Sequence, residues 1–178
     1  MTTWPDIKGW SLDVDRAFLY ERIIALQADK VVELGVYAGR MTFALAEALR
    51  HTGGVVHCVD PWEEMPNGPE IAREFLNTVT KYQLEDRVRI HAQSSHDFAL
   101  RNVPAHVCLT WIDGMHTFEA VRQDLEDWYE RSRVVYGHDW HLEGVRTAAT
   151  EYARSAGLVA RKIEGTDNIW TVSRAPDF

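Results

Sequence analysis

The sequence has 178 residues, of which 46% are hydrophobic, and its 19 basic and 27 acidic residues give a formal net charge of −8. This acidic balance argues against binding duplex nucleic acid, which needs a basic stripe, and no apolar run approaches the ~20 residues that span a bilayer. The N-terminus lacks the basic-then-apolar order of a signal peptide. We therefore expect a cytoplasmic protein with no membrane and no nucleic acid among its partners.

Strand and helix patterns alternate along the chain. Short apolar runs predict seven strands, at residues 30–34, 55–59, 87–92, 107–112, 133–136, 159–163 and 169–173. Apolar residues at helical spacing predict helices at residues 12–26, 40–49, 71–82, 118–128 and 145–156, with a short helix after residues 94–95. This order predicts an α/β, Rossmann-like, doubly wound fold with a mostly parallel seven-stranded sheet and an antiparallel C-terminal edge strand.

The absence of a linker or repeat predicts a single domain over residues 1–178. It divides into an N-terminal helical segment, residues 1–29, and a Rossmann-like core, residues 30–174.

Two predicted strands end in polar groups that can bind a metal or carry a proton. The first is followed by Asp113 and His116, and the second by His138 and Asp139. In an open parallel sheet, ligands bind just outside the carboxyl ends of the strands. Carboxylates suit hard cations such as Mg²⁺, and imidazole is the usual general base near neutral pH. The sequence therefore predicts an active site here; surface decoration is the alternative for a single histidine.

The first strand-to-helix turn contains Glu33, Gly35, Tyr37 and Gly39. Glycines here permit a tight turn and a close approach of a ligand to backbone N–H groups. The Gly-x-x-x-Gly spacing differs from the Gly-x-Gly-x-x-Gly of dinucleotide enzymes, and Glu33 suits a positively charged ligand, such as one with an ammonium or sulfonium group. An ordinary glycine turn with a solvated glutamate is the alternative.

Polar residues also follow the second and third strands. Asp60 can accept hydrogen bonds from ribose hydroxyls, or it can be a turn residue before a proline. Trp62 can cover an adenine ring or pack on the sheet edge. Ser94 and Ser95 can contact an adenine edge, although a helix N-cap is the simpler interpretation.

Taken together, these motifs resemble the class I S-adenosylmethionine-dependent methyltransferases. The segment at residues 32–39 looks like their first motif. The runs at residues 112–125, 137–139 and 144–146 look like the macrocin O-methyltransferase and cephalosporin-hydroxylase-like branch. The resemblance covers about residues 28 to 174.

The resemblance implies S-adenosylmethionine as the cofactor and a small hydroxylated molecule as the acceptor. It implies a cofactor site made of Glu33, Gly35, Tyr37, Gly39, Asp60, Trp62, Ser94, Ser95 and Asp113. His116 would be the catalytic base, and Asp113, His138 and Asp139 would be the metal ligands. The cation is left open, as Mg²⁺ or another divalent metal.

The chain departs from these relatives at two points. They usually place two adjacent carboxylates where this chain has His138-Asp139, so a transition metal and a metal-free site both stay open. The glycine-rich turn before the fifth strand is replaced by residues 131–133. A substrate lid has to come from the N-terminal helix, the 61–69 loop, the 139–143 turn or a partner subunit, so a homo-oligomer is among the expected assemblies.

Two other functions compete with an S-adenosylmethionine-dependent O-methyltransferase. A non-catalytic cofactor-binding module of a larger assembly would bind the cofactor but tolerate Asp113→Ala. A nicotinamide-dependent oxidoreductase is disfavoured by Glu33 and the glycine spacing. A hydroxylase has little support, because no iron-binding triad can be recognised.

Overall fold

The structure is a computed structural model that describes residues 4–63, 65–101, 104 and 106–174. Residues 1–3 of the predicted N-terminal segment, residue 64 of the 61–69 loop and residues 175–178 of the predicted domain lie outside this description. The helices are α1 (Asp13–Leu26), α2 (Arg40–Thr52), α3 (Gly68–Lys81), α4 (Ser95–Arg101), α5 (Phe118–Trp128), a 3-10 turn (Tyr129–Arg131) and α6 (Glu143–Ala156). The strands are β1 (Lys30–Leu34), β2 (Val55–Val59), β3 (Val88–His91), β4 (Val107–Ile112), β5 (Ser132–Gly137), β6 (Val159–Lys162) and β7 (Trp170–Ser173).

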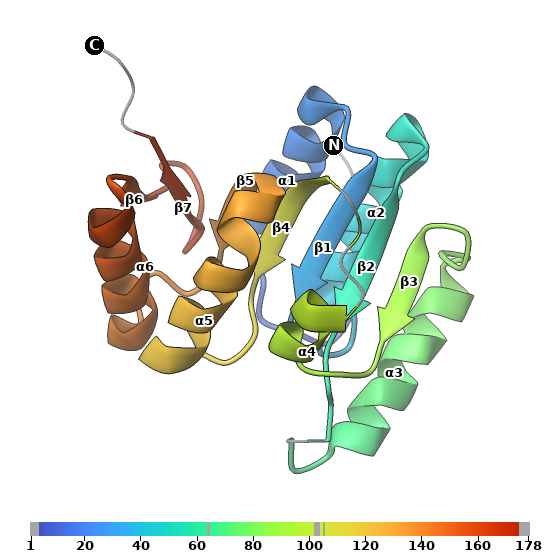
Figure 1. Cartoon of the computed structure of the whole chain (residues 1–178). Coiled ribbons are helices and arrows are strands. Elements are labelled where there is room, and N and C mark those ends of the chain that lie inside the picture. The colour runs from blue at the N-terminus through green and yellow to red at the C-terminus, as the bar shows by residue number, and fades with distance from the viewer. Residues whose placement is uncertain (1–3, 64, 102–103, 105, 175–178) are drawn as a thin grey trace.

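The strands form one sheet in the order β3-β2-β1-β4-β5-β7-β6 (Figure 1). The first five strands in this order are parallel to one another, and β7 is antiparallel to both β5 and β6. This confirms the predicted mostly parallel, Rossmann-like sheet and its C-terminal hairpin. The antiparallel strand β7 lies inside the sheet, and β6 folds back beyond it to form the edge.

Helices cover both faces of this sheet, and each face has its own hydrophobic core. Helices α4, α5 and α6 lie in front of the sheet in the view of Figure 1, and α1 and α2 lie behind it. The core behind includes Leu19, Leu45 and Phe75, and the core in front includes Phe98 and Trp128. Among the described residues, no helix combines the length and the apolar character needed to cross a membrane.

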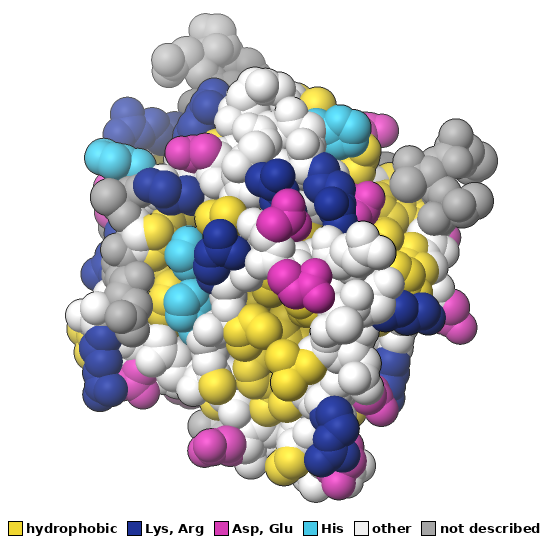
Figure 2. All heavy atoms as spheres, turned by 90° about the vertical axis from the view of Figure 1, so that its right-hand side faces the viewer, with side chains coloured by type: hydrophobic (Ala, Val, Ile, Leu, Met, Phe, Trp, Pro, Cys, Tyr) yellow, Lys and Arg dark blue, Asp and Glu magenta, His cyan; other side chains and the backbone are white. Residues whose placement is uncertain are grey.

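Strand β3 forms the other edge of the sheet, next to α3. Arg89 and Ile90 on this strand are exposed. Figure 2 shows the molecule from this side, where Lys and Arg side chains lie among acidic ones around a group of hydrophobic side chains. A charged side chain on a short edge strand opposes pairing with another chain.

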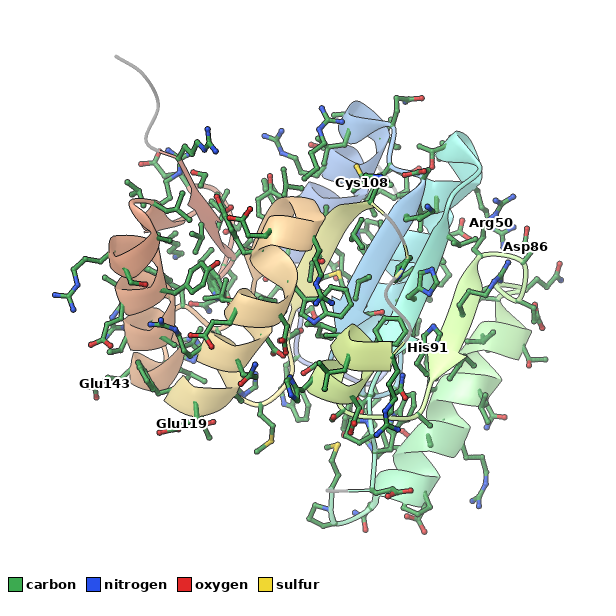
Figure 3. The ribbon with its side chains drawn as sticks, viewed as in Figure 1. Arg50, Asp86, His91, Cys108, Glu119 and Glu143 are labelled. Atoms are coloured by element: carbon green, nitrogen blue, oxygen red, sulfur yellow. The ribbon has the colours of Figure 1, made fainter. Side chains whose placement is uncertain are left out.

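The order of the strands reverses at β1: β2 and β3 lie on one side of it, and β4 and β5 lie on the other. Ligands of open α/β sheets bind at such a switch point, outside the carboxyl ends of the strands. Figure 3 marks this end by Glu119 and Glu143, at the first turns of α5 and α6, while Cys108 at the start of β4 lies at the opposite end. The fold thus predicts where the site should lie.

Candidate active site

A pocket of ≈ 560 Å³ opens at this switch point. It is lined by turns that follow β1, β2, β3, β4 and β5, and by residues just before α1. Most of the predicted site residues contribute to its wall: Gly35, Tyr37, Asp60, Trp62, Ser94, Ser95, Asp113, His116 and His138. Three predicted residues, Glu33, Gly39 and Asp139, do not line it.

Gly35 brings the ends of β1 and β4 into direct contact. Its φ is +86°, and a Cβ built at this position would lie 2.1 Å from the carbonyl oxygen of Asp113. The N–H of Asp113 donates to the carbonyl of Leu34 at 2.8 Å. A side chain larger than hydrogen at position 35 would separate the two strand ends, so glycine is required here.

Asp60 organises the turn after β1. Its Oδ2 accepts hydrogen bonds from the N–H groups of Val36 (2.9 Å) and Tyr37 (3.0 Å), and its Oδ1 accepts one from the N–H of Trp62 (2.7 Å). Tyr37 and Trp62 both have positive φ angles, and Trp62 Nε1 donates to the carbonyl of Tyr37 at 3.0 Å. One carboxylate therefore fixes two adjoining turns of the pocket wall.

The structure places Glu33, a predicted cofactor residue, away from the pocket wall. Side chains alternate along a strand, so Glu33 faces α2 together with Val31, away from the pocket. Its carboxylate accepts a hydrogen bond from the Thr42 hydroxyl at 2.6 Å and lies 3.4 Å from Cys58 Sγ. Burial raises the pKa of Glu33 to about 8. A neutral, buried acid in this layer does not face a cationic ligand.

Gly39 also has a packing role in place of the predicted cofactor contact. It is the N-cap of α2, with a φ of +87°, and a Cβ at this position would lie 2.8 Å from the ring of Phe75. The glycine allows α3 to pack closely against the start of α2. Of the two glycines predicted to approach the ligand, Gly35 lines the pocket and Gly39 does not.

Ser94 and Ser95 both line the pocket, and Ser94 caps α4. The N–H of Asp97 donates to Ser94 Oγ at 3.1 Å, and Ser95 Oγ donates to Asp124 Oδ1 at 2.5 Å. Asp124 is 4% exposed, and burial raises its pKa to about 7. Asp124 therefore belongs to the buried face of α5 and, like the two serines, lines the pocket.

The polar groups after β4 and β5 form one cluster at the pocket wall. His116 Nε2 lies 2.9 Å from Asp139 Oδ2 and 3.8 Å from Asp113 Oδ1. His138 Nδ1 lies 3.6 Å from Asp113 Oδ1 and 3.4 Å from Asp139 Oδ2. The structure therefore brings together all four residues that the sequence singled out at these strand ends. Asp139 does not line the pocket itself, but it contacts the two imidazoles that do.

Charge in this cluster favours protonated imidazoles. Asp113 and Asp139 raise the pKa of His116 to about 9. Burial favours the neutral form of His138, but Asp139, Asp15 and Asp113 outweigh it and raise its pKa to about 10. Burial likewise favours the neutral form of Asp139, yet the two imidazoles lower its pKa below the usual range. The carboxylates of the cluster thus hold protons on the two imidazoles.

The cluster has a donor set that suits a divalent cation. One ligand atom from each of Asp113, His116 and Asp139 lies within 4.8 Å of the others. Two carboxylates and one imidazole suit Mn²⁺ or Zn²⁺ better than they suit Mg²⁺, because Mg²⁺ prefers ligands that are all oxygen. His138 Nδ1, which the sequence predicted as a ligand, faces the same carboxylates.

The N-terminal region makes two contributions to the site that the sequence pattern does not reveal. Residues 8–11 line the pocket, and Arg40 holds this segment by donating to the carbonyl groups of Ser11 (2.7 Å) and Ile7 (2.5 Å). The exposed ring of Trp10 packs on Tyr37 with 4.7 Å between centroids. Asp15 on α1 reaches His138 Nε2 at 3.2 Å. Of the predicted lid candidates, the 61–69 loop borders the pocket, whereas the N-terminal helix α1 does not line it and only the residues before it do.

Solved structures with the same fold include several methyltransferases. The chain resembles the solved O-methyltransferase from Bacillus cereus in complex with SAH, with 19% identity, 97% of this chain and 84% of that chain covered, and a TM-score of 0.72. It also resembles the O-methyltransferase TomG from Streptomyces achromogenes (17% identity, 89% and 78% covered, TM-score 0.69). A third similar structure is the SAM-dependent O-methyltransferase from Thermotoga maritima (14% identity, 96% and 68% covered, TM-score 0.71). At these identities the likeness establishes a shared fold.

A match in sequence establishes the family. Residues 32–140, from the middle of β1 to just beyond the cluster at the end of β5, match the family described as "Methyltransferase domain". This range spans more than half of the chain and contains the Gly35 turn, Asp60 and the cluster around His116. The protein belongs to the methyltransferase domain family.

Proposed function

We propose that the protein is an S-adenosylmethionine-dependent methyltransferase that methylates a hydroxyl oxygen of a small acceptor. The family match supports methyl transfer, and the similar structures that are named as O-methyltransferases support an oxygen acceptor. The observation that carries the proposal is the contact between Gly35 and Asp113, because it puts the cofactor-type turn of β1 beside the acid–base cluster. The narrower resemblance to the macrocin O-methyltransferase branch rests on the motif at residues 112–125.

The wall from Gly35 to Ser95 is the cofactor half of the proposed site. Tyr37, Asp60 and Trp62 form a rigid, partly aromatic surface whose carboxylate faces the pocket. S-adenosylmethionine, when bound, supplies a methyl group that its sulfonium already activates. The protein has to exclude water and hold the acceptor oxygen in line with that methyl group, which is mainly catalysis by proximity.

The cluster after β4 and β5 is the acceptor half. In this proposal His116 takes the proton from the acceptor hydroxyl, and Asp139 stabilises the resulting imidazolium at 2.9 Å. Since the two carboxylates hold His116 protonated at neutral pH, His116 first has to release that proton to the solvent, to which its side chain is exposed. A positive charge bound beside Asp113, such as a sulfonium group, would lower the pKa of His116 and so favour this release.

A divalent cation is an optional part of this half. Asp113 and Asp139, with His138 or His116, would hold it, and it would acidify a hydroxyl bound to it. When His116 serves as a ligand it cannot serve as the base. Activity with EDTA and with added Mg²⁺ or Mn²⁺ therefore separates the two arrangements.

The first experiment is titration calorimetry with S-adenosylmethionine and S-adenosylhomocysteine, followed by methyl transfer from labelled cofactor to a panel of hydroxylated small molecules. We expect binding of both and transfer to at least one acceptor. Absence of binding would reject the proposal. Binding without transfer, together with an Asp113→Ala variant that keeps its cellular role, would favour the non-catalytic module. Binding of reduced nicotinamide dinucleotide in place of S-adenosylmethionine would favour an oxidoreductase.

A further inference from the structure

A buried carboxylate on α1 contacts the active-site cluster from behind. Asp15 is fully buried and His138 is 6% exposed. Asp15 Oδ2 lies 3.2 Å from His138 Nε2, although the two residues are 123 positions apart in the chain. Asp15 does not line the pocket, so any effect it has on a bound molecule must pass through His138.

Both oxygens of Asp15 are engaged. Oδ1 accepts a hydrogen bond of 2.9 Å from the backbone N–H of Asp167, in the turn between β6 and β7, and Oδ2 faces the imidazole. The carboxylate thereby joins α1, the end of β5 and the C-terminal hairpin. A side chain that has to satisfy two donors in opposite directions has one orientation.

The backbone at His138 is fixed as well. Its carbonyl accepts a hydrogen bond of 2.6 Å from Trp170 Nε1, and its N–H donates to the carbonyl of Ile112 at 3.0 Å. An imidazole is rigid and planar, so holding Nε2 on one side determines where Nδ1 points on the other. Nδ1 points between Asp113 and Asp139, at 3.6 and 3.4 Å.

We propose that Asp15 is a positioning residue of the methyl-transfer site, and that it acts by holding the His138 ring with Nδ1 toward Asp113 and Asp139. The inference rests on the proposed function and extends it to α1. A carboxylate that binds the far nitrogen of a functional histidine fixes the orientation of the ring. Through this contact the N-terminal helix becomes part of the acceptor half.

A cation site is the competing interpretation of the same residues. Ligand atoms of Asp15, His138 and Asp167 lie within 4.8 Å of one another. However, Asp15 already accepts two hydrogen bonds, and the Asp167 carboxylate is exposed and accepts a hydrogen bond of 2.7 Å from Asn168. Positioning needs only the backbone N–H of Asp167, whereas a cation needs its side chain. The variant Asp167→Ala therefore distinguishes the two.

The main test is Asp15→Asn, which keeps the side-chain volume but has a single oxygen. The amide can accept either from Asp167 N–H or from His138 Nε2–H, and its NH₂ group must face the other donor. We expect kcat for methyl transfer to fall about 10- to 100-fold, while the Kd for S-adenosylhomocysteine changes by less than about twofold. Glu21→Gln, an exposed acid on the same helix, and Asp167→Ala should both keep the wild-type kcat.

Nitrogen NMR of the His138 ring gives a readout that needs no activity. In the wild type, Nε2 should have the chemical shift of a protonated nitrogen and its proton should exchange slowly with water. In D15N, the Nε2 proton should exchange faster with water, because the contact that holds it is lost. If D15N does not fold, the wild-type spectrum still decides, since an unprotonated Nε2 would overturn the proposal.

Other results would also overturn it. One is a folded D15N with wild-type kcat. The other is a loss of activity in D167A that added Mn²⁺ restores, which would assign Asp15, His138 and Asp167 to a cation site. If no protein in the series binds S-adenosylhomocysteine, the proposed function fails, and the NMR signal of Nε2 still tests the contact between Asp15 and His138.

Discussion

The hydroxyl of Thr42 donates a hydrogen bond of 2.6 Å to the carboxyl group of Glu33 in the buried layer between α2 and β1. The second oxygen of that carboxyl group, Oε1, is buried and has no hydrogen-bond partner among the described residues. Burial raises the pKa of Glu33 from 4.5 to about 8. The folded protein thus keeps Glu33 protonated over a pH range in which the unfolded chain ionises it.

This difference makes stability depend on pH. Below pH 4.5 both states are protonated at this residue. Between pH 4.5 and about 8 the folded state binds the extra proton, so the free energy of unfolding falls as pH rises, by roughly 1 kcal/mol per pH unit from this group. The variant Glu33→Gln removes that contribution. Urea unfolding from pH 5 to 8 should show a flatter profile for E33Q, and the exposed Glu70→Gln should keep the wild-type slope. Identical slopes for E33Q and wild type would mean that Glu33 ionises normally in the fold.

Replacing Asp60 should affect both the fold and the cofactor. Asp60 accepts three backbone N–H groups from two turns, and an asparagine side chain has only one oxygen with which to accept. We expect Asp60→Asn to destabilise the protein by about 1 to 3 kcal/mol and to weaken S-adenosylhomocysteine binding by at least about tenfold. Thermal unfolding and calorimetry measure the two effects, with the exposed Asp86→Asn as control. Unchanged affinity in a folded D60N would remove Asp60 from the cofactor half.

His116 should matter for chemistry more than for binding. We expect His116→Ala to lower kcat roughly 100- to 10,000-fold with little change in cofactor affinity, because the ring lies on the acceptor side of Asp113. His141 is a matched control, since its Nδ1 lies 3.7 Å from the other oxygen of Asp139 and it does not line the pocket. Kinetics of both variants with one acceptor decide this. Equal rates in H116A and wild type would exclude His116 as the base.

Gly35 and Gly53 separate backbone conformation from close packing. Both have positive φ, but a Cβ at Gly35 meets the Asp113 carbonyl at 2.1 Å, whereas a Cβ at Gly53 meets nothing within 4 Å. We expect Gly53→Ala to cost roughly 1 kcal/mol and Gly35→Ala about 3 kcal/mol or more. Urea unfolding measures both. A similar cost for the two would indicate that the ends of β1 and β4 can move apart.

The fold could be predicted from the sequence because strand and helix periods alternate cleanly, and parallel strands then place their carboxyl ends at one edge. That rule located Asp60, Asp113, His116 and Asp139 together. The same rule does not bring Glu33 to the pocket, because side chains alternate along a strand and Glu33 faces α2.

Asp15 and Asp124 were missed for a different reason. Each lies on the apolar face of its helix, Asp15 four residues before Leu19 and Asp124 four residues before Trp128. An acid on a buried face is a detectable signal, but the pattern alone does not show what it contacts. The partner of Asp15 is 123 residues away, and only the assembled sheet brings them together.

The position of β7 has a consequence for biosynthesis. Trp170 packs against Gly137, where a Cβ would lie 2.2 Å from its ring, and its indole N–H binds the carbonyl of His138. Among the described strands, β7 is the last to leave the ribosome, and until it does β5 has an unpaired edge. A nascent chain that stops before residue 170 would already contain the cofactor half, yet its acceptor half would be unfinished. Catalytic competence should therefore arise late, after translation has passed the hairpin.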